Sequence, residues 1–134
     1  MGRRLIVDTG VLVASERGIR PLATVVQPED DLVIAAVTIA ELQTGVELAS
    51  EARRVARARF VLDVLTTLPI EAYDQEVAVI HGRLLAHAHR TGTKRGAHDL
   101  LIAATAGATG RIILTTDAKA SFHDLPGVEC LVVA

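Results

Sequence analysis

The segment Leu5-Ile6-Val7-Asp8-Thr9-Gly10 places a carboxylate directly after an unbroken apolar run. An apolar run without alternation is typical of a strand covered on both faces of a parallel sheet. A similar segment, Ile112-Ile113-Leu114-Thr115-Thr116-Asp117, lies near the other end of the chain. Because ligand sites of parallel sheets form beyond the carboxyl ends of the strands, we expect Asp8 and Asp117 at the same edge.

Strands and helices are predicted to alternate along the rest of the chain. Continuous apolar runs at 32–35 and 128–133 indicate two more buried strands, and 68–70 is a weaker candidate whose Pro69 belongs at a sheet edge. Helical patterns cover 51–65, the segment after Asp74, and 99–107. This alternation favours an α/β fold, a three-layer α/β/α arrangement around a parallel sheet.

Composition limits the classes of protein that fit. A chain of 134 residues, half of them hydrophobic, is long enough for one folded domain spanning 1–134. The net charge of −2 gives no general basic field for nucleic acid, so any cationic surface must be local. The single Cys130 reads as a core residue in a reducing compartment, and no apolar stretch is long enough to span a bilayer. We expect a cytoplasmic protein that does not enter a membrane.

Four acids carry the functional hypothesis, although each alone fits a structural role. Asp8 and Asp117 could cap helices, Thr38 with Glu41 fits a capping box, and Asp99 suits the first turn of a helix. Gathered at one edge, however, such carboxylates would repel each other. A hard divalent cation with oxygen ligands would relieve that repulsion and could activate water for phosphodiester cleavage.

The chain resembles the PIN domain, and within it the VapC toxins of toxin–antitoxin pairs. The resemblance rests on segments that keep their order over nearly the whole chain: Leu5-Ile-Val-Asp-Thr-Gly10, Thr38-Ile-Ala-Glu-Leu42, Ala97-His-Asp-Leu-Leu-Ile-Ala-Ala-Thr-Ala106, Leu114-Thr-Thr-Asp117 and Leu125-Pro-Gly-Val128. It implies a five-stranded parallel sheet in the order 3-2-1-4-5, which places the Pro69 strand at an edge.

The resemblance also implies the chemistry. It makes the protein a metal-dependent endoribonuclease acting as a toxin, with a catalytic cluster of Asp8, Glu41, Asp99 and Asp117. Asp8, Asp99 and Asp117 would hold Mg²⁺ or Mn²⁺, and Glu41 would complete the cluster directly or through water. The remaining site residues are expected to contact substrate, with hydroxyls beside the cluster and a cation near Asp99: Thr9, Thr115 and Arg95.

RNA and a VapB-like antitoxin are the partners implied, together with a homodimer. The arginines of the 53–59 segment could meet RNA phosphate, but a solvated helix face explains them as well. An apolar surplus at 11–13 and 39–48 suggests either a partner-binding groove or core packing. The antitoxin is expected to place a basic side chain in the acid cluster.

Two other functions share some of these sequence features. A phosphoacceptor receiver domain needs paired acids after its first strand, and this chain offers only Asp8 there, so we reject it. The alternative within the same fold is an RNA-processing nuclease or RNA-binding module without a toxin role.

Overall fold

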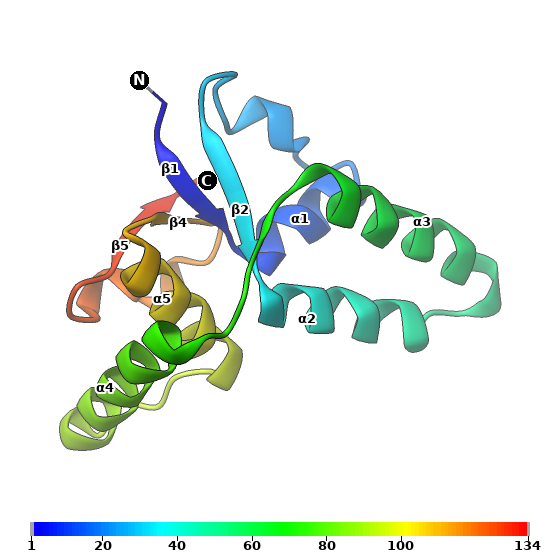
Figure 1. Cartoon of the computed structure of the whole chain (residues 1–134). Helices are drawn as coiled ribbons and strands as arrows, with labels where there is room; N and C mark the ends of the chain where they lie inside the picture. The colour runs from blue at the N-terminus through cyan, green and yellow to red at the C-terminus, as the bar shows by residue number, and fades with distance from the viewer. Residues whose placement is uncertain (1, 134) are drawn as a thin grey trace.

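A computed structural model, which describes residues 2–133, contains a five-stranded parallel sheet in the order β3-β2-β1-β4-β5 (Figure 1). The predicted strand order and α/β class are therefore confirmed. The strands are short, and the central strand β1 pairs with β2 on one side and β4 on the other. Their bounds are β1 Arg4–Val7, β2 Asp31–Ala35, β3 Ile70–Glu71, β4 Ile112–Thr115 and β5 Glu129–Val132.

Helices cover both faces of the sheet because the strand side chains alternate between two apolar cores. Leu5 and Val7 join one core with α1, α2 and α3, whereas Ile6 joins the other core with α4 and α5. This arrangement gives the predicted three layers. The helices are α1 Thr9–Glu16, α2 Ala36–Glu47, α3 Glu51–Thr67, α4 Gln75–Thr91 and α5 Ala97–Thr109.

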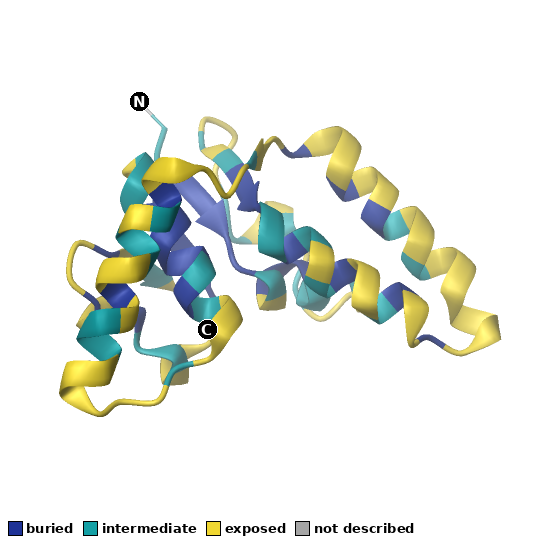
Figure 2. Ribbon diagram, turned by 60° about the horizontal axis from the view of Figure 1, so that its bottom comes forward, coloured by how far each residue is buried: buried dark blue, intermediate teal, exposed yellow. Residues whose placement is uncertain are grey.

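Helices α2 and α3 form an antiparallel hairpin that projects to one side of the sheet (Figure 1). The outward side of α3 is largely exposed, while Val61 and Val64 are buried (Figure 2). Exposed apolar side chains also lie on this arm, with Leu48 at 81%, Val55 at 72% and Leu62 at 60% exposure. This α2–α3 arm therefore has an apolar surface that is not packed against the rest of the protein.

Three local expectations need correction. The strand that was expected to be buried at 128–133 is β5, an edge strand without a buried residue. The edge strand begins at Ile70, after Pro69, whose carbonyl accepts from the Ile34 N–H at 3.0 Å. Helix α2 begins at Ala36 with Ala35 as its N-cap, so the capping box of Thr38 and Glu41 is wrong.

The apolar surplus at 11–13 and 39–48 is mostly core. Val11, Leu12, Leu42 and Val46 are buried, because α1 and α2 pack directly on the sheet, and only Leu48 is strongly exposed. A partner-binding groove built from these residues is therefore not supported.

The amino ends of the strands are held together by ionic contacts. Arg111 is buried, and its guanidinium donates to the carbonyls of Leu5 and Asp31 at 3.3 and 3.0 Å. Nearby, Arg3 donates to both carboxylate oxygens of Asp30, which keeps the pKa of Asp30 well below its usual range. Cations and acids are paired at this edge, in contrast to the opposite one.

Among residues 2–133, every helix is too short or too polar to cross a lipid bilayer.

Phe122 anchors the segment that follows Asp117. It opens the short 3-10 helix η3 (Phe122–Asp124), is 1% exposed, and belongs to the same core as Leu125 and Val128. We predict that Phe122→Ala lowers the free energy of unfolding by about 3–5 kcal/mol, because it leaves a cavity. Phe122→Leu should cost much less, and urea unfolding measures both. Equal, small losses in the two variants would contradict this packing.

Candidate active site

Asp8 lies at the carboxyl end of β1 and is the N-cap of α1. Its side chain is only 8% exposed and accepts hydrogen bonds from the Thr9 N–H at 2.9 Å and the Thr115 hydroxyl at 2.7 Å. Burial raises the pKa of the Asp8 carboxyl, and the charges of Asp99 and Glu41 raise it further against the opposing effect of these hydrogen bonds. A carboxylate in such a place is held precisely but is poorly solvated.

Glu41 reaches the same edge from within α2. Thr9 donates its hydroxyl to Glu41 Oε1 at 2.7 Å and also lies 3.2 Å from the hydroxyl of Thr38, which is fully buried. Three residues from α1 and α2 thus form one hydrogen-bonded group, and Thr9 links Asp8 to Glu41. The prediction that Thr38 caps a helix is wrong: Thr38 lies within α2, and its hydroxyl is hydrogen-bonded to that of Thr9.

Asp99 stands in the first turn of α5, as expected, and is half-buried. Burial raises the pKa of its carboxyl, the charges of Asp117 and Glu41 add to this increase, and His98 and Arg95 oppose it. Asp99 therefore feels two other acids of the predicted cluster. No hydrogen bond to its carboxylate from another described residue offsets the repulsion.

Asp117 is the most exposed of the four acids. Its side chain accepts from the Lys119 N–H at 2.9 Å and caps the short 3-10 helix η2 (Ala118–Ala120), while its own N–H donates to the Thr115 hydroxyl at 3.0 Å. Thr115 is fully buried and so connects Asp117 to Asp8 through a single hydroxyl. Thr9 and Thr115, predicted as substrate contacts, both bond to site acids here.

Two basic side chains, His98 and Arg95, border the acids. His98 is mostly exposed, yet its Nδ1 lies 3.3 Å from Glu41 Oε2. The only sequence signal for this contact is that His98 directly precedes Asp99. Arg95 donates from Nη1 to the carbonyls of Ala120 and Ser121 at 2.7 and 3.1 Å. Arg95 thereby ties the loop before α5 to the segment after Asp117. Its predicted contact with substrate stays a prediction.

The acids fit a water-rich metal site better than a closed one. Within the described part of the chain, no three His, Cys, Asp or Glu side chains stand close enough to hold a metal ion by themselves. Mg²⁺ usually keeps several waters and takes only one or two protein carboxylates, so Asp8 and Asp99 would suffice. Each of these two carboxylates is repelled by neighbouring acids, and a divalent cation would relieve that repulsion. The metal-ligand roles of Asp8, Asp99 and Asp117 stay predictions.

Comparisons with known proteins agree with this fold. The family model described as PIN domain matches residues 5–127. "Ribonuclease VapC" of Rickettsia bellii is 30% identical, with 96% of each chain covered. The VapBC-5 toxin–antitoxin structure from Mycobacterium tuberculosis aligns with a TM-score of 0.80 at 26% identity, covering 97% of this chain and 98% of its own. The VapBC2 structure from Rickettsia felis, at 20% identity, has a TM-score of 0.87 over 98% of this chain and 99% of its own, which shows the shared fold.

The fold and the acid cluster at the carboxyl edge define a PIN-domain protein. Within that class, the chain belongs to the VapC ribonuclease family.

Asp99 gives a direct test of the repulsion. The pKa of Asp99 in the folded state is raised above its unfolded value of about 3.9. Between these two pKa values the folded protein binds more protons than the unfolded protein, so its stability falls as pH rises. We predict that metal-free Asp99→Asn protein melts at a higher temperature than wild type at neutral pH. The difference should shrink below pH 4, where the wild-type carboxyl is protonated in both states.

Asp63→Asn is the matched control, since it removes one negative charge from an exposed position on α3. It should leave the melting temperature nearly unchanged. An Asp99→Asn protein that melts below wild type at pH 7, with the control unaffected, would show that the acids do not repel each other.

Proposed function

We propose that this VapC-family chain is a metal-dependent endoribonuclease that cleaves RNA phosphodiester bonds with Mg²⁺ or Mn²⁺ and acts as the toxin of a toxin–antitoxin pair. One observation carries the proposal: the carboxylates of Asp8 and Asp99 are both desolvated and both repelled by neighbouring acids at the edge where this fold binds ligands. The relatives named ribonuclease support RNA as the substrate.

The residues of the acid cluster and the two threonines beside it would have different roles in the reaction. Asp8 and Asp99 would hold the cation, which when bound supplies charge stabilisation and a more acidic bound water. Thr9 occupies Oε1 of Glu41, so Oε2 of Glu41 is left to accept from His98 or from a water molecule. Thr115 keeps the Asp8 carboxylate in one orientation and fixes the backbone of Asp117. The protein therefore supplies positioned acceptors around the phosphodiester group.

The first functional prediction concerns cleavage. Asp8→Asn and Asp99→Asn should each reduce manganese-dependent cleavage of a labelled RNA by more than about 100-fold, because each loses a direct metal ligand. Their circular dichroism should match wild type. Glu129→Gln, which neutralises an exposed acid on β5, is the charge-matched control here and should cleave normally. Wild-type cleavage that persists in excess EDTA would contradict a metal-dependent reaction.

A metal-induced gain in stability is the second consequence. A cation that binds only the folded state raises stability by mass action, by about 2.7 kcal/mol at a hundred-fold excess over its dissociation constant. Manganese should therefore raise the melting temperature of wild type in thermal denaturation, and of Asp63→Asn equally. It should have little effect on Asp99→Asn. A gain of the same size in Asp99→Asn would place the bound metal elsewhere.

The antitoxin is proposed to inhibit by bringing its own cation to the acids. An Arg guanidinium pairs well with carboxylates and would offset the repulsion that the metal otherwise offsets. The exposed apolar residues of the α2–α3 arm, Leu48, Val55 and Leu62, offer an apolar surface on which an amphipathic partner helix can dock. Structures of toxin–antitoxin complexes among the relatives support a protein partner of this kind.

Coexpression tests this role. The chain expressed alone should arrest growth, and coexpression with the protein encoded by the adjacent gene should restore it and give a complex that copurifies. Added manganese should compete with the inhibitor in the cleavage assay. Cleavage without toxicity and without a tight complex would instead favour an RNA-processing nuclease without a toxin role. The homodimer and the cytoplasmic location stay predictions; light scattering of the free chain tests the first.

A further inference from the structure

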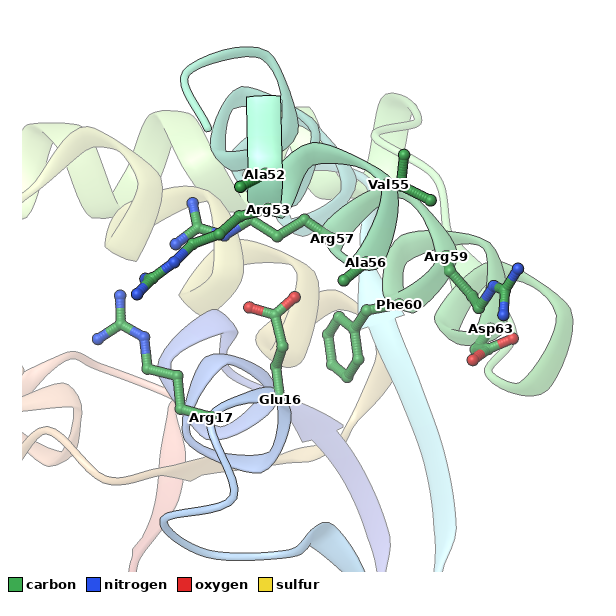
Figure 3. Close-up of a pocket in the computed structure, with 10 residues that line it drawn as sticks. All are labelled: Glu16, Arg17, Ala52, Arg53, Val55, Ala56, Arg57, Arg59, Phe60 and Asp63. Atoms are coloured by element: carbon green, nitrogen blue, oxygen red, sulfur yellow. The ribbon is translucent and has the colours of Figure 1, made fainter. Parts of the chain in front are cut away.

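A second feature lies outside the acid cluster, in a cavity of about 720 Å³ between the end of α1 and the first turns of α3. Its lining includes four arginines, Arg17, Arg53, Arg57 and Arg59, and two acids, Glu16 and Asp63 (Figure 3). Arg59 lies at the far end of the cavity near Asp63, whereas the other three extend together toward its opposite end (Figure 3). The cavity is therefore cationic at one end.

The three converging guanidiniums have no ion-pair partner among residues 2–133. Arg57 is half-buried, and its Nη1 donates to the Gly45 carbonyl at 3.1 Å, while Arg17 and Arg53 are exposed. Within residues 2–133, none of the three forms an ion pair within 4.0 Å, although Glu16 lies in the same cavity. Like charges held together in this way favour binding of an anion.

This cationic end adjoins the acid cluster. A smaller hollow of about 120 Å³ is lined by Arg17 and Arg57 together with Glu41. Glu16 lines both hollows, so the arginines and the cluster share a continuous stretch of surface. A chain-like ligand in the cavity could therefore extend to Glu41.

We propose that Arg17, Arg53 and Arg57 form a phosphate-binding subsite that holds the RNA backbone beside the scissile bond. The proposal rests on the proposed function and names how that site takes its substrate. The protein carries a net charge of −2 and its cluster of acids repels phosphate, so a strand needs local cations to approach. Guanidinium groups match phosphate oxygens in bidentate geometry.

The test measures binding of a short fluorescent single-stranded RNA in EDTA, where the RNA is not cut. Arg17→Gln/Arg53→Gln protein removes two exposed cations and leaves Arg57, with its structural bond to Gly45, in place. We expect its affinity for RNA to fall by about ten-fold or more, since hydrogen bonds between charged groups are lost. The slope of log affinity against log salt should become shallower by about 0.7 per phosphate contact removed.

Arg4→Gln/Arg83→Gln protein is the charge-matched control, because both arginines are exposed and lie outside both hollows. The affinity of the control protein for the RNA should stay close to that of wild type. Any loss that both variants share is an effect of net charge and is subtracted. An unchanged salt slope in Arg17→Gln/Arg53→Gln protein would overturn the proposal. So would unchanged RNA affinity with a weakened complex with the antitoxin, which would assign the cavity to a protein partner.

The two proposals fail in different ways. If wild type binds RNA in EDTA through the arginines but never cleaves it with manganese, the subsite stands and the nuclease activity fails. If cleavage is normal while the double variant binds as wild type does, only the subsite is wrong.

Discussion

Repulsion among carboxylates at the carboxyl edge of the sheet is the constraint around which this structure is arranged. Asp8 and Asp99 are desolvated and face other acids, so the metal-free fold retains an unfavourable electrostatic interaction there. The opposite edge shows the contrast, because Arg111 and Arg3 are paired with Asp31 and Asp30. Paired charges stabilise the amino edge of the sheet. At the carboxyl edge, the repulsion between acids would be relieved by a metal cation or by a cationic inhibitor.

Buried hydroxyl groups make that arrangement specific. Thr115 bonds to Asp8 and to the backbone of Asp117, and Thr9 joins Glu41 to Thr38. Each hydroxyl limits the freedom of an acid without neutralising it, so the negative charge stays available. Positioned ligands of this kind reduce the reorganisation that binding and reaction would otherwise require.

Much of the fold and part of the site could be predicted from the sequence. Continuous apolar runs marked the buried strands β1, β2 and β4, because such runs report burial, whereas the run at 128–133 became the edge strand β5, which has no buried residue. Asp8 and Asp99 lie where their places after a strand and in a helix start predicted them. Thr38 was misread because a capping box and an interior helical hydroxyl have the same local sequence. The convergence of Arg17 with Arg53 and Arg57 has no local signal, since it depends on how the end of α1 packs beside α3.

The most direct measurement is an anomalous difference map from crystals of the antitoxin-free protein soaked in manganese. The account predicts a manganese peak between Asp8 and Asp99, with carboxylate oxygens of both residues in its coordination shell and waters completing it. A manganese peak found only away from these two carboxylates would contradict the account. So would the absence of any peak beside Asp8 and Asp99 at saturating manganese.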